Sequence, residues 1–183
     1  MGAILLAGCG ARPSAPTLVG AAREGRVDLI PVLVKQGADP NQRAGVNGWT
    51  PLMHAIHKNQ KGSVIALLDA GADVNARGDG ALTPLMMAAG YGYTDIVNIL
   101  LDRGADAHAQ LPNGENALTL AVFGVADIDR FTVPDCQVST VKALLEKAPD
   151  MRFVGPEGAL RAVTIAKMKG CAGLAETMGR GNR

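Results

Sequence analysis

Histidine is the residue type in this chain best suited to hold a metal ion, and two of its three histidines lie close together. His54 and His57 are three residues apart, so that in a helix both imidazoles share one face and reach the same ion. No Cys, Asp or Glu joins them nearby, and His108 lies in a different part of the chain. We therefore predict no metal site and interpret the pair as partly exposed side chains on a binding surface.

Other residues that could act as catalysts or as metal ligands are not arranged in a pattern that supports either role. Asp127, Asp129 and Asp135 are carboxylates of the kind calcium prefers, but their segment has neither the glycine of the sharp turn nor the closing glutamate. The serines have no base partner or nucleophile-elbow glycines, and no glycine-rich phosphate loop ends in Lys-Ser or Lys-Thr. We predict that the chain is not an enzyme and needs no cofactor.

The elements that position all of these side chains are repeated along the chain. The motif Gly-Ala-Asp-x-Asn occurs twice and returns as Gly-Ala-Asp-Ala-His, while Thr-Pro-Leu occurs twice and returns as Asn-Ala-Leu. A period near 33 residues is the signature of a stacked repeat architecture. The first motif occupies residues 37–41, 71–75 and 104–108, and the second occupies residues 50–52, 83–85 and 116–118.

Each repeat has the residues of two helices and a finger. Thr, or Asn116 in the degraded copy, caps a first helix that Pro can begin. A second helix follows and ends at the Gly of the Gly-Ala-Asp motif, which adopts the left-handed conformation at little cost. The Asn-Gly pairs at 47–48 and 113–114 then predict hairpin-like fingers.

This combination resembles the ankyrin repeat and implies an all-α solenoid of stacked helix-turn-helix units with β-hairpin-like fingers. The resemblance covers residues 16–178, and residues 179–183 form a tail. The fourth unit carries an insertion near 125–137, and the degenerate first and last units fit a stack whose ends face water. The expected units are 16–49, 50–82, 83–115, 116–160 and 161–178.

By resemblance, ankyrin proteins bind other proteins through the finger tips and the concave face of the first helices. Half of the six aromatic residues fall on positions that the family pattern leaves variable, and aromatic side chains are enriched at binding hot spots. The alternative is that these rings merely cover neighbouring fingers or helix ends. The predicted partner-binding residues are Trp49, His57, Lys58, Leu82, Tyr91, Glu115 and Phe123, with Arg43, Arg77, Asp79 and Gln110 as rim contacts at the finger tips.

The N-terminus carries Leu-Ala-Gly-Cys at residues 6–9, followed by a segment rich in Ala, Pro and Ser. The tetrad resembles the lipobox of bacterial lipoproteins, in which the cysteine receives diacylglycerol and the signal is cut just before it. By this resemblance Cys9 is lipidated, residues 1–15 are a signal remnant and tether, and Gly10 in place of Asp favours the outer membrane. The eight residues before Cys9 contain no Lys or Arg, which departs from the basic start of a secretory signal.

Two further cysteines, Cys136 and Cys171, fall in equivalent inter-helix turns of the fourth and fifth units. Equivalent positions of adjacent repeats are neighbours, so we expect a disulfide if the compartment is oxidising. Two free thiols in a cytoplasmic protein are the alternative.

Composition narrows the classes of partner that the chain is expected to bind. The net charge of +1 gives no field that recruits nucleic acid, and no apolar run is long enough to span a bilayer. We expect a monomer that binds a protein in the bacterial periplasm, as a scaffold or as an inhibitor that neutralises a toxin or enzyme. A cytoplasmic or secreted host-directed adaptor is the alternative if the N-terminus is misleading.

Overall fold

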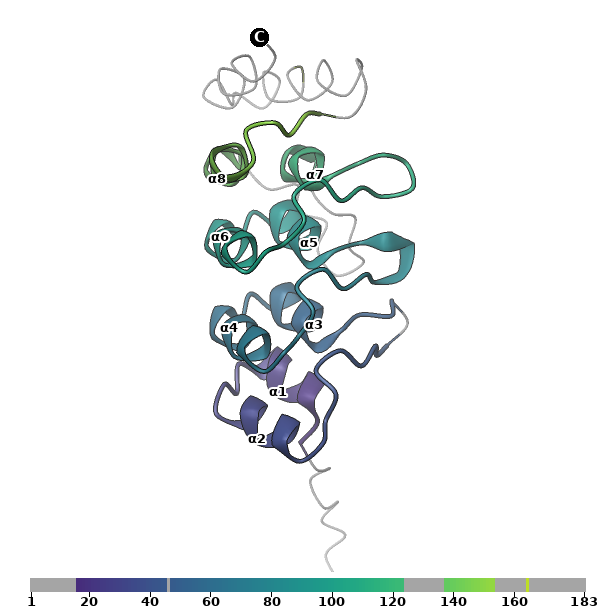
Figure 1. Cartoon of the computed structure of the whole chain (residues 1–183), viewed down its shortest axis with the longest axis vertical. Coiled ribbons are helices and arrows are strands. Elements are labelled where there is room, and N and C mark those ends of the chain that lie inside the picture. The colour runs from purple at the N-terminus through teal and green to yellow at the C-terminus, as the bar shows by residue number, and fades with distance from the viewer. Residues whose placement is uncertain (1–15, 46, 124–136, 154–163, 165–183) are drawn as a thin grey trace, which may run out of the picture.

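Helix pairs stacked in one direction make up the part of the chain that the structure describes. The computed structural model describes residues 16–45, 47–123, 137–153 and 164. Figure 1 shows α1, α3, α5 and α7 as one column, α2, α4, α6 and α8 as a second, and the loops between pairs projecting sideways as fingers. The helices are α1 (Leu18–Glu24), α2 (Leu29–Lys35), α3 (Pro51–His57), α4 (Lys61–Asp69), α5 (Pro84–Tyr91), α6 (Thr94–Asp102), α7 (Ala117–Phe123) and α8 (Val138–Lys147), with a short 3-10 helix η1 (Asp79–Ala81).

Local capping explains where the helices begin and end. The Thr50 and Thr83 hydroxyls accept hydrogen bonds from the amides three residues on, and a proline occupies the first turn after each. Asn116 takes the same role, since its Oδ1 accepts from the Thr119 amide at 2.9 Å. Gly71 follows α4 with φ +90° and Gly104 follows α6 with φ +84°, so the predicted left-handed stops are confirmed.

Small residues on the first helices let neighbouring units approach closely. Ala55, Ala88 and Ala121 are all at most 1% exposed, and they lie on α3, α5 and α7, which pack on one another in that order. The second helices supply larger side chains, such as Leu67 and Leu100, that are fully buried. One continuous core therefore runs along the stack, and the chain is an all-α repeat solenoid as predicted.

Asparagine side chains join successive units at the bases of the fingers. Asn41 accepts a hydrogen bond from the Asp73 amide at 2.7 Å and donates one to the Gly71 carbonyl. Asn75 repeats both bonds one unit later, with the Asp106 amide at 2.8 Å and the Gly104 carbonyl at 3.1 Å. The Asn of the repeated motif thus fixes the spacing between units.

Isolated backbone bridges, Ala44 with Trp49 and Gln110 with Asn116, close two of the fingers. The finger between them in sequence, which joins α4 to α5, contains η1 instead. No extended strand occurs among the described residues. Within the same ranges no helix is long and apolar enough to cross a membrane. Several predicted features lie outside the described residues: Cys9, Cys136, Cys171, residues 125–136 of the insertion and all of the fifth unit except Thr164.

Candidate protein-binding surface

Rings from three parts of the chain form one continuous group, which we call the aromatic row: Trp49, His54, His57, Tyr91 and Tyr93. The ring centroid of Trp49 lies 5.5 Å from that of His54 and 5.3 Å from that of His57. The His57 ring is 5.9 Å from Tyr91, and Tyr91 is 5.4 Å from Tyr93. The row therefore links the first finger to α3 and to the turn between α5 and α6.

Packing between units positions these rings. Trp49 precedes the helix cap Thr50, His57 ends α3 and Tyr91 ends α5. Because α3 packs against α5, the C-terminal ends of these helices lie side by side and bring His57 to Tyr91. The Nδ1 atom of His57 and the Tyr91 hydroxyl are 3.0 Å apart and share a hydrogen bond.

His57 corrects the expectation of a partly exposed histidine. Its side chain is buried, at 5% exposure, between Trp49 and Tyr91. Trp49, Tyr91 and Tyr93 are half-buried, so each of these residues remains partly accessible. His57 is therefore an internal contact between Trp49 and Tyr91, and the three larger aromatic residues are the accessible part of the row.

His54, in contrast, is half-buried, as expected for a partly exposed histidine. Its Nε2 atom is buried without a hydrogen-bond partner. Burial lowers the pKa of the imidazole below 6.5, a hydrogen bond to the Ala44 backbone opposes that shift, and the charge of Arg23 adds to it. The ring is consequently neutral near pH 7. Within the described residues, no group of three or more metal-ligating side chains includes it.

The other predicted contacts lie on the same elements, and their role as a binding site stays a prediction. Lys58 is the C-cap residue of α3 and Phe123 ends α7, and both are half-buried. Leu82 and Glu115 precede their caps as Trp49 precedes Thr50, and they too are half-buried. No bond among the described residues brings Phe123 into the aromatic row.

Two of the charged residues predicted as finger-tip contacts, Arg43 and Asp79, interact with each other within the protein. Arg43 forms an ion pair with Asp79 of the next finger at 2.9 Å and donates from Nε to the Gly48 carbonyl at 2.9 Å. This pair joins two neighbouring fingers on an exposed surface. Arg77 and Gln110 are exposed, and they fit the predicted rim better than Arg43 does.

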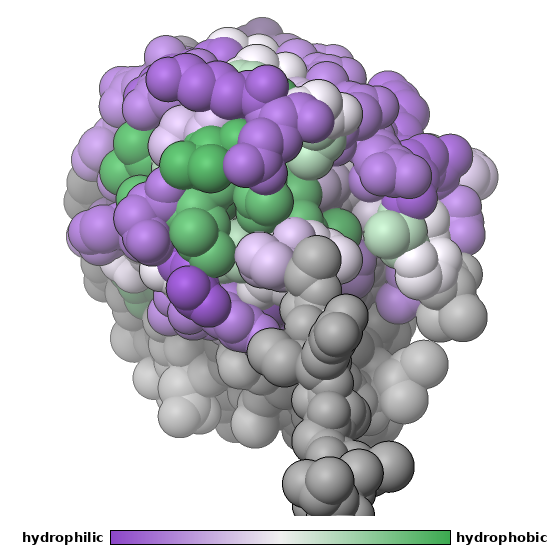
Figure 2. Space-filling model, turned by 90° about the horizontal axis from the view of Figure 1, so that it is seen from below, coloured by the Kyte–Doolittle hydropathy of each residue, from purple (hydrophilic) through white to green (hydrophobic). Residues whose placement is uncertain are grey.

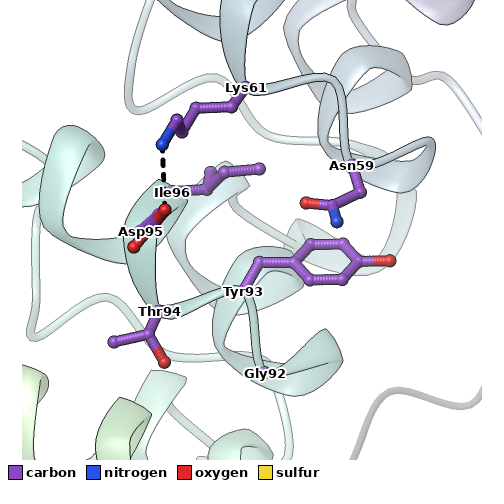
Figure 3. A pocket seen from close by; sticks show the side chains of 7 residues that line it. All are labelled: Asn59, Lys61, Gly92, Tyr93, Thr94, Asp95 and Ile96. Carbon is purple, nitrogen blue, oxygen red and sulfur yellow. Dashed lines mark hydrogen bonds and ion pairs between the residues drawn. The ribbon is translucent and has the colours of Figure 1, made fainter.

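A hollow of about 430 Å³ adjoins the end of the aromatic row (Figure 3). Tyr93 belongs to both features, and its ring lies beside Asn59, while Lys61 Nζ and Asp95 Oδ2 form an ion pair at 2.9 Å across the opposite wall. The sequence reasoning missed Tyr93, although an aromatic residue directly after the turn glycine Gly92 marks it. The hollow has room for one side chain of a partner.

Comparisons with known proteins identify the family. A family model described as ankyrin repeats (many copies) matches residues 67–121, and one described as ankyrin repeats (3 copies) matches residues 4–78. Together with the stacked helix pairs, these matches show that the chain is an ankyrin repeat protein. Ankyrin repeats make it a protein–protein interaction module.

Two curated relatives share parts of this sequence. The ankyrin repeat and SAM domain-containing protein 6 of Rattus norvegicus is 42% identical over 73 residues, which is 40% of this chain and 8% of the relative. The ankyrin repeat protein nuc-2 of Neurospora crassa is 47% identical over 55 residues, which is 30% of this chain and 5% of the relative. The chain therefore spans under a tenth of the length of either protein.

Proposed function

We propose that this chain is a non-enzymatic ankyrin protein, anchored by lipid in the bacterial periplasm, that captures another protein through the aromatic row. The observation that carries the proposal is that Trp49, Tyr91 and Tyr93 form a connected and partly accessible surface across successive units. Rigid aromatic side chains bury much area at low entropic cost when a partner binds. Phe123, a half-buried ring at the end of α7 in the fourth unit, is the second aromatic position of the proposed surface, outside the row itself.

Partner capture is tested by removing rings from the row. The full chain and its Trp49→Ala and Phe123→Ala variants are cross-linked in envelope fractions, and the captured proteins are identified by mass spectrometry. We expect one partner that both variants lose. Ile99→Ala is the matched control, because Ile99 is half-buried on α6 in the other helix column.

Each outcome of this test has a separate meaning. Retention of the partner by both ring variants would contradict the binding surface. Strong inhibition of the captured protein by the purified chain would assign the inhibitor role, and binding without inhibition would assign the scaffold role. A large loss of thermal stability in the ring variants, not shared by Ile99→Ala, would show that the rings are structural.

The lipid anchor rests on the Leu-Ala-Gly-Cys tetrad at residues 6–9 and on the Pro-rich segment after it. Membranes of the native source should contain a chain with diacylglycerol on Cys9, and a Cys9→Ser chain should be soluble and unmodified. The same intact-mass measurement should show two missing hydrogens for a disulfide between Cys136 and Cys171. An unmodified and fully reduced chain that keeps residues 1–8 would refute both proposals.

A further inference from the structure

The N-terminal end of the stack carries an accessible apolar surface, which we call the end face: Leu29, Val32 and Leu33 of α2. Their i, i+3 and i+4 spacing places the three side chains on one side of the helix. Val32 is 45% exposed, and Leu29 and Leu33 are half-buried. Figure 2, which looks onto this end of the molecule, shows an apolar patch surrounded by hydrophilic residues.

Equivalent positions in the interior units show that the end face is made of core positions. Leu33 lies four residues before its helix-ending glycine, as Leu67 and Leu100 do in the next two units, and both of those are 0% exposed. Leu29 likewise corresponds to Ser63 and Ile96, which are at most 1% exposed. The difference arises because α4 packs between α2 and α6, whereas α2 packs only on α1 and α4 among the described helices.

A terminal unit that faces water normally has a polar outer surface. Leucines at two core positions depart from that pattern and from the expected water-facing end, and they indicate that apolar material covers this end of the stack. The exposed charges of the first unit nearly balance, with Arg23, Arg26, Lys35 and Arg43 against Glu24, Asp28 and Asp39. Such a surface is suited to apolar contact more than to electrostatic attraction.

The length of the tether between Cys9 and the first unit indicates what this apolar material is. Six residues lie between Cys9 and Pro16, where the described structure begins, and the seven steps from Cα to Cα span at most about 25 Å when fully extended. A lipid on Cys9 thus keeps the start of the first unit within about 25 Å of the bilayer, nearer than the tether requires of any other described unit. We propose that the end face docks on the phospholipid surface in which Cys9 is anchored; this inference rests on the lipid anchor of the proposed function.

Docking gives the stack a defined orientation. The end face lies at one end of the long axis in Figure 1, so the helix columns would stand away from the membrane. The aromatic row would then be presented to the periplasm at the level of the second and third units. The diacylglyceryl group on Cys9 carries two acyl chains, which suffice for stable attachment, so contact through the end face would set the orientation of the stack and not its affinity for the membrane.

The test places a fluorescent probe on the end face of the full chain. The protein is produced behind a complete bacterial lipoprotein leader, so that Cys9 is acylated whatever its native processing, and is placed in phosphatidylethanolamine–phosphatidylglycerol vesicles. Trp49→Phe removes the single native tryptophan, and Val32→Trp or the matched control Gln42→Trp supplies the probe. Both positions are exposed and lie in the first unit.

With brominated phospholipids, we expect quenching in the Val32→Trp chain to be about twofold or more that of the Gln42→Trp chain, because only contact with acyl chains quenches strongly. Replacing phosphatidylglycerol by phosphatidylcholine should leave this ratio unchanged. Equal quenching of the two anchored chains would overturn docking, and so would quenching that disappears without the anionic lipid.

Two other results separate this inference from related ones. Self-association of the Cys9→Ser chain without vesicles, abolished by Val32→Asp, would assign the end face to a second copy and overturn lipid docking. Absence of a lipid on Cys9 in the native source would refute the proposed anchor, whereas the quenching result with the supplied leader would still report on the end face itself.

Discussion

Replacing the equivalent leucine of three successive units by alanine should measure how far the N-terminal end of the stack is exposed to solvent. Leu67 and Leu100 are fully buried, so Leu67→Ala and Leu100→Ala each remove a core side chain and leave a cavity that costs about 2–5 kcal/mol. Leu33 is half-buried at the equivalent position, so Leu33→Ala loses part of the transfer free energy and encloses no cavity. We expect a cost of about 1–2 kcal/mol.

Urea unfolding of the Cys9→Ser chain, followed by circular dichroism, is the assay. With a slope of about 2 kcal/mol per molar urea, the interior variants should lower the midpoint by about 1–2.5 M and Leu33→Ala by about 0.5–1 M. A change in slope would show that the substitution uncouples units and no longer reports one transition. Equal losses at Leu33 and Leu67 would refute the reasoning, because they would show that the end face is covered even without a lipid.

Three further perturbations follow from the geometry. Gly71→Ala should cost about 1–2 kcal/mol in the same assay because φ is +90° there, and Gly71→Asn should recover part of the loss; equal losses would contradict the conformational explanation. Asn75→Ala removes two side-chain bonds between units and should speed amide exchange around Asp106, with little change near α1. Burial lowers the pKa of His54 in the folded state below 6.5, so the unfolded state binds more protons and stability should fall as the pH drops through 6.5. Urea midpoints at pH 8 and pH 5.5 should show this fall, and His54→Gln should reduce it; an unchanged pH dependence in that variant would assign the titration to another group.

The helices and their ends were predictable because their causes are local. Thr50 caps a helix within three residues, and Gly71 ends one at the position where a left-handed residue is needed. These signals recur at a fixed period, and recurrence makes each copy evidence for the others. The solenoid and the order of its units therefore followed from the sequence.

The candidate surface was predictable only in part. Trp49 and Tyr91 were identified as rings at positions that vary within the repeat, and their half-buried state fits that interpretation without testing it. Tyr93 was missed because its importance depends on the hollow that it lines with Asn59 and Lys61, and both of those residues come from the unit before. A pattern within one repeat contains no information about which side chain of the neighbouring repeat stands opposite.

What the sequence determined by itself is the repeating unit, since caps, turn glycines and the spacing of apolar residues act within a few residues of one another. Tertiary structure decided the states of single side chains. His57 is buried because Tyr91 comes from the next unit to cover it, and Arg43 is paired because Asp79 lies on the next finger. Leu33 remains half-exposed where Leu67 is buried because no described unit precedes the first one. The physical reason is the same in each case: burial and pairing depend on the neighbouring unit, and stacking brings together residues that are distant in sequence.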